Sequence, residues 1–145
     1  FRSPIVTPAY PQQKLWRESM DHFGLESEGY EPIIDRETKF KVPVLDQFEE
    51  NQLPLAGVIE LTKTTDNSIH MQPIEDLYRF STLYKHTYRN FILRGAGLMD
   101  WHFKTSSKIL PCIDMFHMGR PVTKFTVNEL VDTILTAIGK EESFV

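Results

Sequence analysis

The spacing of apolar residues along this 145-residue chain changes several times between a strand-like and a helix-like period, and this constrains the fold most. Alternating or continuous apolar runs predict strands at residues 40–44, 53–61 and 112–118. The prolines at residues 4–10 indicate an extended connection or an edge strand, and the polar residues 24–38 indicate a surface loop. Turn residues at 64–68 and alternation at 69–71 predict a β-hairpin. Helical spacing predicts helices over residues 14–23, 74–95, 98–110 and 126–138. Strands and helices interleave, so we predict an α/β fold with a mixed sheet and flanking helices.

The last helix has the clearest pattern. Thr126 and Glu129 have the spacing of a capping box, and Gly139 is placed to end the helix. One apolar stripe runs between them, formed by Val127, Leu130, Val131, Ile134, Leu135 and Ile138. We expect the stripe to dock on the core, burying Val127, Leu130, Ile134 and Ile138.

Composition excludes several classes of protein. The net charge is −4 and no Lys/Arg block is present, which argues against nucleic-acid binding. No run reaches the ~20 apolar residues of a membrane span. The single cysteine, Cys112, excludes a disulfide framework and favours a cytoplasmic protein. We interpret Cys112 as a small buried hydrophobe rather than a nucleophile.

The sequence indicates no metal site and identifies no catalytic residue. The five histidines, at positions 22, 70, 86, 102 and 117, have none of the spacings of a zinc site. We expect His102 to be a half-buried, hydrogen-bonded histidine beside Trp101. Tyr78, Tyr84 and Tyr88 have the spacing of a buried helix stripe rather than of a stacking surface.

Three cations are candidates for contacts to phosphate or substrate. Lys14 and Arg17 are placed at the predicted start of the first helix, where a positive helix end would assist anion binding. Arg89 belongs to a basic patch with Lys85, His86 and Arg94, and its guanidinium suits bidentate contact to phosphate or carboxylate. The alternatives are solvated surface cations at Lys14 and Arg17 and favourable placement near a helix end at Arg89.

Several segments of the chain, taken together, have a pattern that is typical of one family of proteins. The most specific segment is residues 8–16, Pro-Ala-Tyr-Pro-Gln-Gln-Lys-Leu-Trp. Three further segments occur in the expected order, at 53–61 (Leu-Pro-Leu-x-x-Val-Ile-x-Leu), 87–89 (Thr-Tyr-Arg) and 101–103 (Trp-His-Phe). Together with the final helix, these segments resemble the HPr-kinase-like proteins of bacteria, which are P-loop serine kinases, over about residues 8–138.

The resemblance implies a fold like the HPr kinase/phosphorylase catalytic domain, itself similar to phosphoenolpyruvate carboxykinase. It implies ATP and Mg²⁺ as cofactors and a serine on a peptide or small protein as the acceptor. The family's P-loop, Gly-x-x-x-x-Gly-Lys-Ser/Thr, and its paired aspartates cannot be matched in this sequence. Residues 1–145 are therefore expected to be the C-terminal portion of one catalytic domain whose P-loop half lies upstream.

The resemblance leaves two questions open. The first is whether the chain belongs to a working serine kinase or is a non-catalytic binding or scaffold domain that keeps the kinase-like fold. The second is whether it forms a homo-oligomer. In either case we expect partner polypeptides, among them the upstream half of the same protein, and neither nucleic acid nor membrane.

Overall fold

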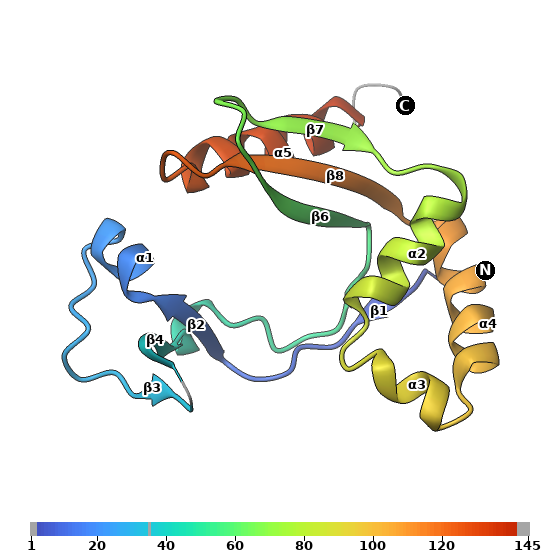
Figure 1. The fold of residues 1–145 in the computed structure, drawn as a ribbon, viewed down its shortest axis with the longest axis horizontal. Helices are drawn as coiled ribbons and strands as arrows, with labels where there is room; N and C mark the ends of the chain where they lie inside the picture. The colour runs from blue at the N-terminus through green and yellow to red at the C-terminus, as the bar shows by residue number, and fades with distance from the viewer. Residues whose placement is uncertain (1–2, 35, 142–145) are drawn as a thin grey trace. The chain divides into compact units, whose positions relative to one another are not determined.

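The computed structural model describes residues 3–34 and 36–141, with side chains described as far as residue 138 (Figure 1). The chain forms two compact units. The smaller unit is Ile5–Leu53, and the larger unit contains residues 3–4 and the chain from Pro54 onward. Among the described residues, no helix combines the length and apolar content required to cross a membrane.

The smaller unit is built on an antiparallel sheet of order β2–β4–β3. Its elements are β2 (Gln12–Trp16), α1 (Arg17–His22), β3 (Pro32–Ile33), β4 (Arg36–Pro43) and the 3₁₀ turn η1 (Leu45–Gln47). Its core consists of Met20 from α1 with Phe40 and Val42 from β4. The alternation predicted from residue 40 is therefore confirmed as a strand, with both apolar side chains on the packed face.

Two expectations for this unit are wrong in part. The helix predicted to begin at Lys14 begins at Arg17, because residues 12–16 pair with β4 and place Leu15 opposite Phe40. The loop expected over residues 24–38 contains β3 and the start of β4. The extended or edge strand expected within residues 4–10 is present as β1 (Ile5–Val6), which pairs with β5 (Leu53–Pro54).

The larger unit contains a mixed sheet of order β6–β8–β7. Its strands are β6 (Gly57–Thr64), β7 (His70–Pro73) and β8 (Asp114–Pro121). β8 lies between the other two, parallel to β6 over eight residues and antiparallel to β7. The predicted β6–β7 hairpin is wrong, because β8 takes the central position between the two strands and buries Met115 and Met118.

The helices of this unit are α2 (Asp76–His86), α3 (Phe91–Gly95), α4 (Met99–Ile109) and α5 (Val127–Glu141), with the 3₁₀ turn η2 (Leu110–Cys112) after α4. α4 confirms the helix predicted at 98–110. The helix predicted over 74–95 is interrupted, because the Asn90 amide donates to the carbonyls of Tyr84 and Lys85 and so caps α2. Figure 1 shows α2, α3 and α4 in succession below the sheet, and α5 alongside β7 and β8.

One side of the larger unit's sheet is closed by a core cluster around η2. Leu110, Ile113 and Met115 are buried there, with Phe80 and Leu83 of α2 packed against them. The Arg79 guanidinium supports the same cluster by donating to the carbonyls of Leu110 and Ile113, each at 2.6 Å. This packing fixes the position of α2 against β8.

The exposed faces of these helices differ from the predicted stripes. Tyr84 is half-buried, but Tyr78 and Tyr88 are exposed, so the tyrosine stripe is wrong at two of its three positions. On α4, His102 points inward as expected, whereas Trp101 is 60% exposed. Helical spacing therefore identified the elements, but their buried faces depend on neighbours that the local pattern does not contain.

The start of α5 also differs from expectation. Thr126 is buried, yet its hydroxyl has no hydrogen-bond partner within the described part of the chain, so the capping box does not form. The Glu129 carboxylate is paired with Lys124 instead, at 2.9 Å. Gly139 lies inside α5 rather than after it, which a helix tolerates at a cost of about 1 kcal/mol.

Burial along the α5 stripe is graded. Leu130 is buried and Val127 and Ile134 are half-buried, but Ile138 is exposed, which corrects the expectation for that residue. An apolar pocket of about 330 Å³ lies between α5 and the sheet, lined among others by Ile59, Phe116 and Ile134. The predicted α/β class is confirmed, since the described residues form a mixed sheet with flanking helices. They contain three small sheets in all.

Candidate functional site

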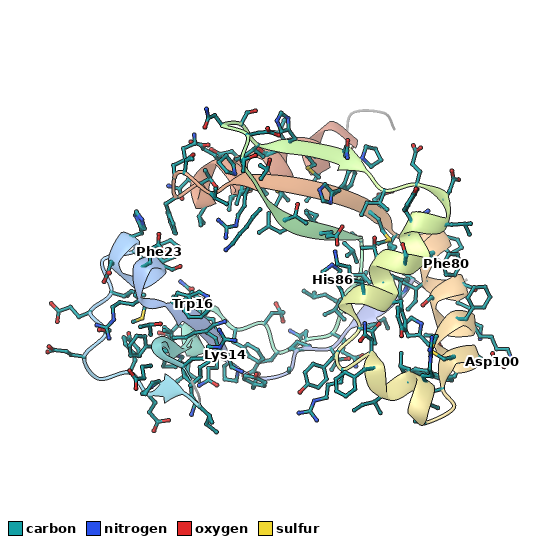
Figure 2. All side chains as sticks on the ribbon, in the orientation of Figure 1. Lys14, Trp16, Phe23, Phe80, His86 and Asp100 are labelled. Atoms are coloured by element: carbon teal, nitrogen blue, oxygen red, sulfur yellow. The ribbon has the colours of Figure 1, made fainter. Side chains whose placement is uncertain are left out.

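A charged network lies in the larger unit where α2 meets β6 and β8. Its centre is Glu60 in the middle of β6, whose side chain is 9% exposed. The Glu60 Oε1 atom is 2.6 Å from Lys85 Nζ and 2.8 Å from His86 Nε2. The Oε2 atom is 3.1 Å from Nδ1 of His117, the residue directly opposite on β8. His86, labelled on α2 in Figure 2, thus joins the last turn of that helix to the sheet.

A hydroxyl extends this network by one residue. His117 contacts Glu60 through Nδ1 and lies 3.1 Å from Thr62 Oγ1 through Nε2. Thr62 is two positions after Glu60, so β6 places both side chains on the same face of the sheet. The order Thr62–His117–Glu60 holds the imidazole ring at both nitrogens and fixes its orientation.

The network stabilises the charged form of its carboxylate. Hydrogen bonds from Lys85, then His86, then His117 lower the pKa of Glu60 from its ordinary 4.5 to about 2. A general base for chemistry at neutral pH needs a pKa near that pH. Glu60 is therefore suited to hold three cationic or polar groups in place rather than to accept a proton from a substrate.

An open pocket of about 290 Å³ lies beside the network. Glu60 and His117 line it together with Gln72, Tyr78 and Thr82. The pocket has both polar and apolar lining and belongs entirely to the larger unit. It could admit a small polar group close to the His117 ring.

The sequence-predicted cations Lys14 and Arg17 lie in the smaller unit. Lys14, labelled in Figure 2, is exposed on β2 opposite Lys41, so the helix-terminus argument for Lys14 is wrong. Arg17 is the first residue of α1, so its expected place in the first turn of the helix is confirmed. Its guanidinium donates to Ser27 Oγ at 3.0 Å and lies 5.2 Å from the centre of the Phe40 ring. These contacts give Arg17 a structural role and leave Lys14 open to solvent.

Arg89 lies in the larger unit, in the turn between α2 and α3 rather than on a long helix. Its guanidinium is 5.2 Å from the centre of the Tyr88 ring, and both side chains are exposed. The three predicted site residues are thus divided between the two units. Arg89 is close in sequence to Lys85 and His86, which belong to the Glu60 network.

Sequence reasoning missed Glu60, Thr62 and His117. One signal was present: Glu60 is a carboxylate inside an otherwise apolar strand pattern at 53–61. A charged residue is rarely buried unless it is paired, so that position pointed to a polar partner. Nothing local indicated His117, which is 57 residues away and is brought opposite Glu60 by the parallel pairing of β6 and β8.

The structure also gives the positions of His102 and Cys112, the other residues for which the sequence led to an expectation. His102 is half-buried and contacts Thr87 Oγ1 at 2.8 Å, as expected for a hydrogen-bonded histidine. Cys112 is half-buried in η2 rather than in a strand. Within residues 3–34 and 36–141, no group of three or more His, Cys, Asp or Glu side chains is arranged to hold a metal ion.

Comparisons of the chain with family models, with curated proteins and with solved structures gave no match.

Proposed function

We propose that this chain is the C-terminal part of an ATP-dependent serine kinase of the HPr-kinase-like type. The complete enzyme transfers the γ-phosphoryl group of ATP to a serine hydroxyl of a peptide or small protein. The observation that carries the proposal is the segment at residues 8–16, followed in order by the weaker segments at 53–61, 87–89 and 101–103. ATP and Mg²⁺ are held mainly by a P-loop half encoded upstream.

Two features of the larger unit support a need for further polypeptide. β6 is an edge strand of its sheet, since no other described strand pairs with its free side, although parallel strands are usually interior and covered. Apolar side chains are exposed on helices beside this sheet, including Trp101 at 60% and Ile138 at 58%. Side chains of this kind are available for a partner to cover. An upstream half that extends the sheet accounts for both features.

In this proposal the chain supplies the acceptor side of the enzyme. Lys14 and Arg89 are exposed cations that can contact the acceptor or the transferring phosphoryl group, where positive charge stabilises the charge that develops. Arg17, which is already bound to Ser27, supports α1 and contributes less. The Glu60 network holds α2 on the sheet and so fixes the helix that precedes Arg89.

The test is phosphoryl transfer by the chain joined to its encoded upstream segment. We expect transfer from Mg-ATP to serine peptides by the joined protein, and no micromolar binding of Mg-ATP by residues 1–145 alone, because a backbone cradle for the phosphates is missing. Tight Mg-ATP binding to this chain alone, measured by calorimetry, would contradict the division into two halves. A joined protein that binds peptide but transfers no phosphate would favour the scaffold alternative.

Variants of the joined protein separate the roles of the cations. Lys14→Ala or Arg89→Ala should lower turnover by about 100-fold if the side chain contacts the developing phosphoryl charge. Lys104→Ala removes another exposed cation, on α4, and should change turnover by less than about threefold. Melting temperatures are compared for all variants. Near-normal turnover in both test variants would leave this chain a structural role only.

A further inference from the structure

The turn between α2 and α3 is held by side chains on both of its ends. The Asn90 N–H donates to the Thr87 carbonyl at 3.2 Å, which closes a β-turn with Tyr88 and Arg89 at its tip. The Thr87 hydroxyl donates to the Leu83 carbonyl at 2.7 Å, and the Asn90 amide donates to the Tyr84 carbonyl at 3.0 Å. The tip is therefore attached to the last turn of α2 at both ends.

His102 of α4 fixes the same turn from a second helix. Its Nε2 atom is 2.8 Å from Thr87 Oγ1. The Thr87 hydroxyl hydrogen is already given to Leu83, so His102 acts as the donor in this contact. The ring of His102 also meets Tyr84 edge-on, with 5.6 Å between the ring centres. The turn is thus held in one conformation by α2 and α4 together.

The backbone at the tip is strained. Arg89 has a φ angle of 51°, in the left-handed region that glycine and asparagine adopt far more readily than arginine. Strain of this kind persists where surrounding contacts over-determine the conformation, and it is concentrated at functional sites. In this turn the strained residue is Arg89 and its neighbour is Tyr88. Both side chains are exposed to solvent.

The surface around the tip combines exposed aromatic rings with positive charge. Tyr88 is 82% exposed and Phe91 is 73% exposed. Residues 85–99 contain Lys85, Arg89 and Arg94 and no Asp or Glu, in a chain whose net charge is −4. Lys85 is neutralised by Glu60, so Arg89 and Arg94 carry the positive charge of the segment. Tyrosine and arginine, together with tryptophan, are enriched in binding hot spots.

We propose that the Tyr88–Arg89 turn is a docking element for an acidic, extended segment of a partner polypeptide. This inference rests on the proposed function, in which the partner is the chain that carries the acceptor serine. A carboxylate of the partner pairs with the Arg89 guanidinium, and an adjacent side chain packs on Tyr88 and Phe91. Because the turn is held rigid, little conformational entropy is lost when the partner binds.

The experiment measures binding of a fluorescein-labelled peptide by fluorescence anisotropy, with the 145-residue chain at low salt. The probe has a central serine and a tyrosine flanked by Asp and Glu. A matched peptide carries Asn and Gln in place of the acidic residues. We expect the acidic peptide to bind more tightly than its neutral counterpart, with an affinity that falls as salt is raised.

Three variants test the turn itself. Arg89→Ala and Tyr88→Ala should each weaken binding by about 10-fold, and Lys104→Ala should change it by less than about twofold. Arg89→Gly removes the guanidinium but suits the positive φ angle, so it should lose binding while the melting temperature stays the same or rises. That variant separates loss of the docking contact from unfolding.

Two results would overturn the proposal: equal binding of the acidic and neutral peptides, or binding by Arg89→Gly that matches the Lys104→Ala control. The outcome is independent of phosphoryl transfer. Docking without transfer by the joined protein would refute only the kinase, and transfer without docking would refute only the role of this turn.

Discussion

Replacing Glu60 with glutamine tests the charged network that fixes α2 on the sheet. The change keeps the size of the side chain and removes its negative charge. Lys85 and His117 then lose their anionic partner, although hydrogen bonds to the amide oxygen remain possible. We expect Glu60→Gln to lower the free energy of unfolding at neutral pH.

The size of the effect follows from the pKa of Glu60 and from the exposure of its partners. A fall in pKa from 4.5 to about 2 corresponds to an upper limit of about 3 kcal/mol at neutral pH. The Lys85 and His86 side chains are 63% and 51% exposed, so water screens their charges. With that screening we expect a loss of about 1–2 kcal/mol.

The dependence on pH has a definite sign. Because folding lowers the pKa of Glu60, its contribution is fully present above the unfolded-state pKa of 4.5 and is lost as the pH falls toward about 2. The difference between the native protein and Glu60→Gln should therefore shrink as the pH is lowered from neutral to about 3.5. A difference that grew on acidification would contradict the assignment.

Urea unfolding followed by circular dichroism measures the loss of unfolding free energy and the dependence of that loss on pH. Glu129→Gln is the matched control, since Glu129 pairs with Lys124 and both side chains are about half exposed. The control should cost about 0.5 kcal/mol. If Glu60→Gln were no more destabilising than Glu129→Gln at neutral pH, the network would not be holding α2, and the reasoning would fail.

Three further changes test local features by the same unfolding assay. Arg89→Gly should raise the free energy of unfolding by about 1 kcal/mol, because glycine adopts the φ angle of 51° without strain; a loss of stability would show that the turn is unstrained. Leu130→Ala should cost about 2–4 kcal/mol through lost burial, whereas a cost below about 1 kcal/mol would mean that α5 is not docked. Thr126→Val should be neutral or stabilising by up to about 1 kcal/mol, since its buried hydroxyl lacks a partner among the described residues, and a clear loss would restore the capping role.

Elements with a strong local pattern could be predicted from the sequence. α4 and β4 were located by apolar spacing alone, and α5 was located by its stripe. Helix boundaries were less predictable, because β2 takes residues 12–16 into a sheet that the helical spacing of Leu15 and Trp16 did not reveal. Tertiary pairing overrode the local pattern there.

Long-range pairing could not be predicted. The turn at 64–68 indicated a hairpin, but β8, more than 40 residues later, lies between β6 and β7. The same pairing creates the Glu60–His117 contact, so the network was invisible to reasoning over short windows. Arg89 was found as a candidate from its chemistry, but its position at the tip of a strained turn depends on hydrogen bonds from Asn90 and Thr87.

The central claim, that the chain is part of a serine kinase, is tested most directly by mass spectrometry of a serine peptide. The peptide is incubated with Mg-ATP and either residues 1–145 alone or the same chain joined to the upstream P-loop half that we propose. We expect phosphoserine only with the joined protein, and none when serine is replaced by alanine. Absence of phosphoserine with a folded joined protein that carries an intact P-loop, across acidic and neutral serine peptides, would contradict the account.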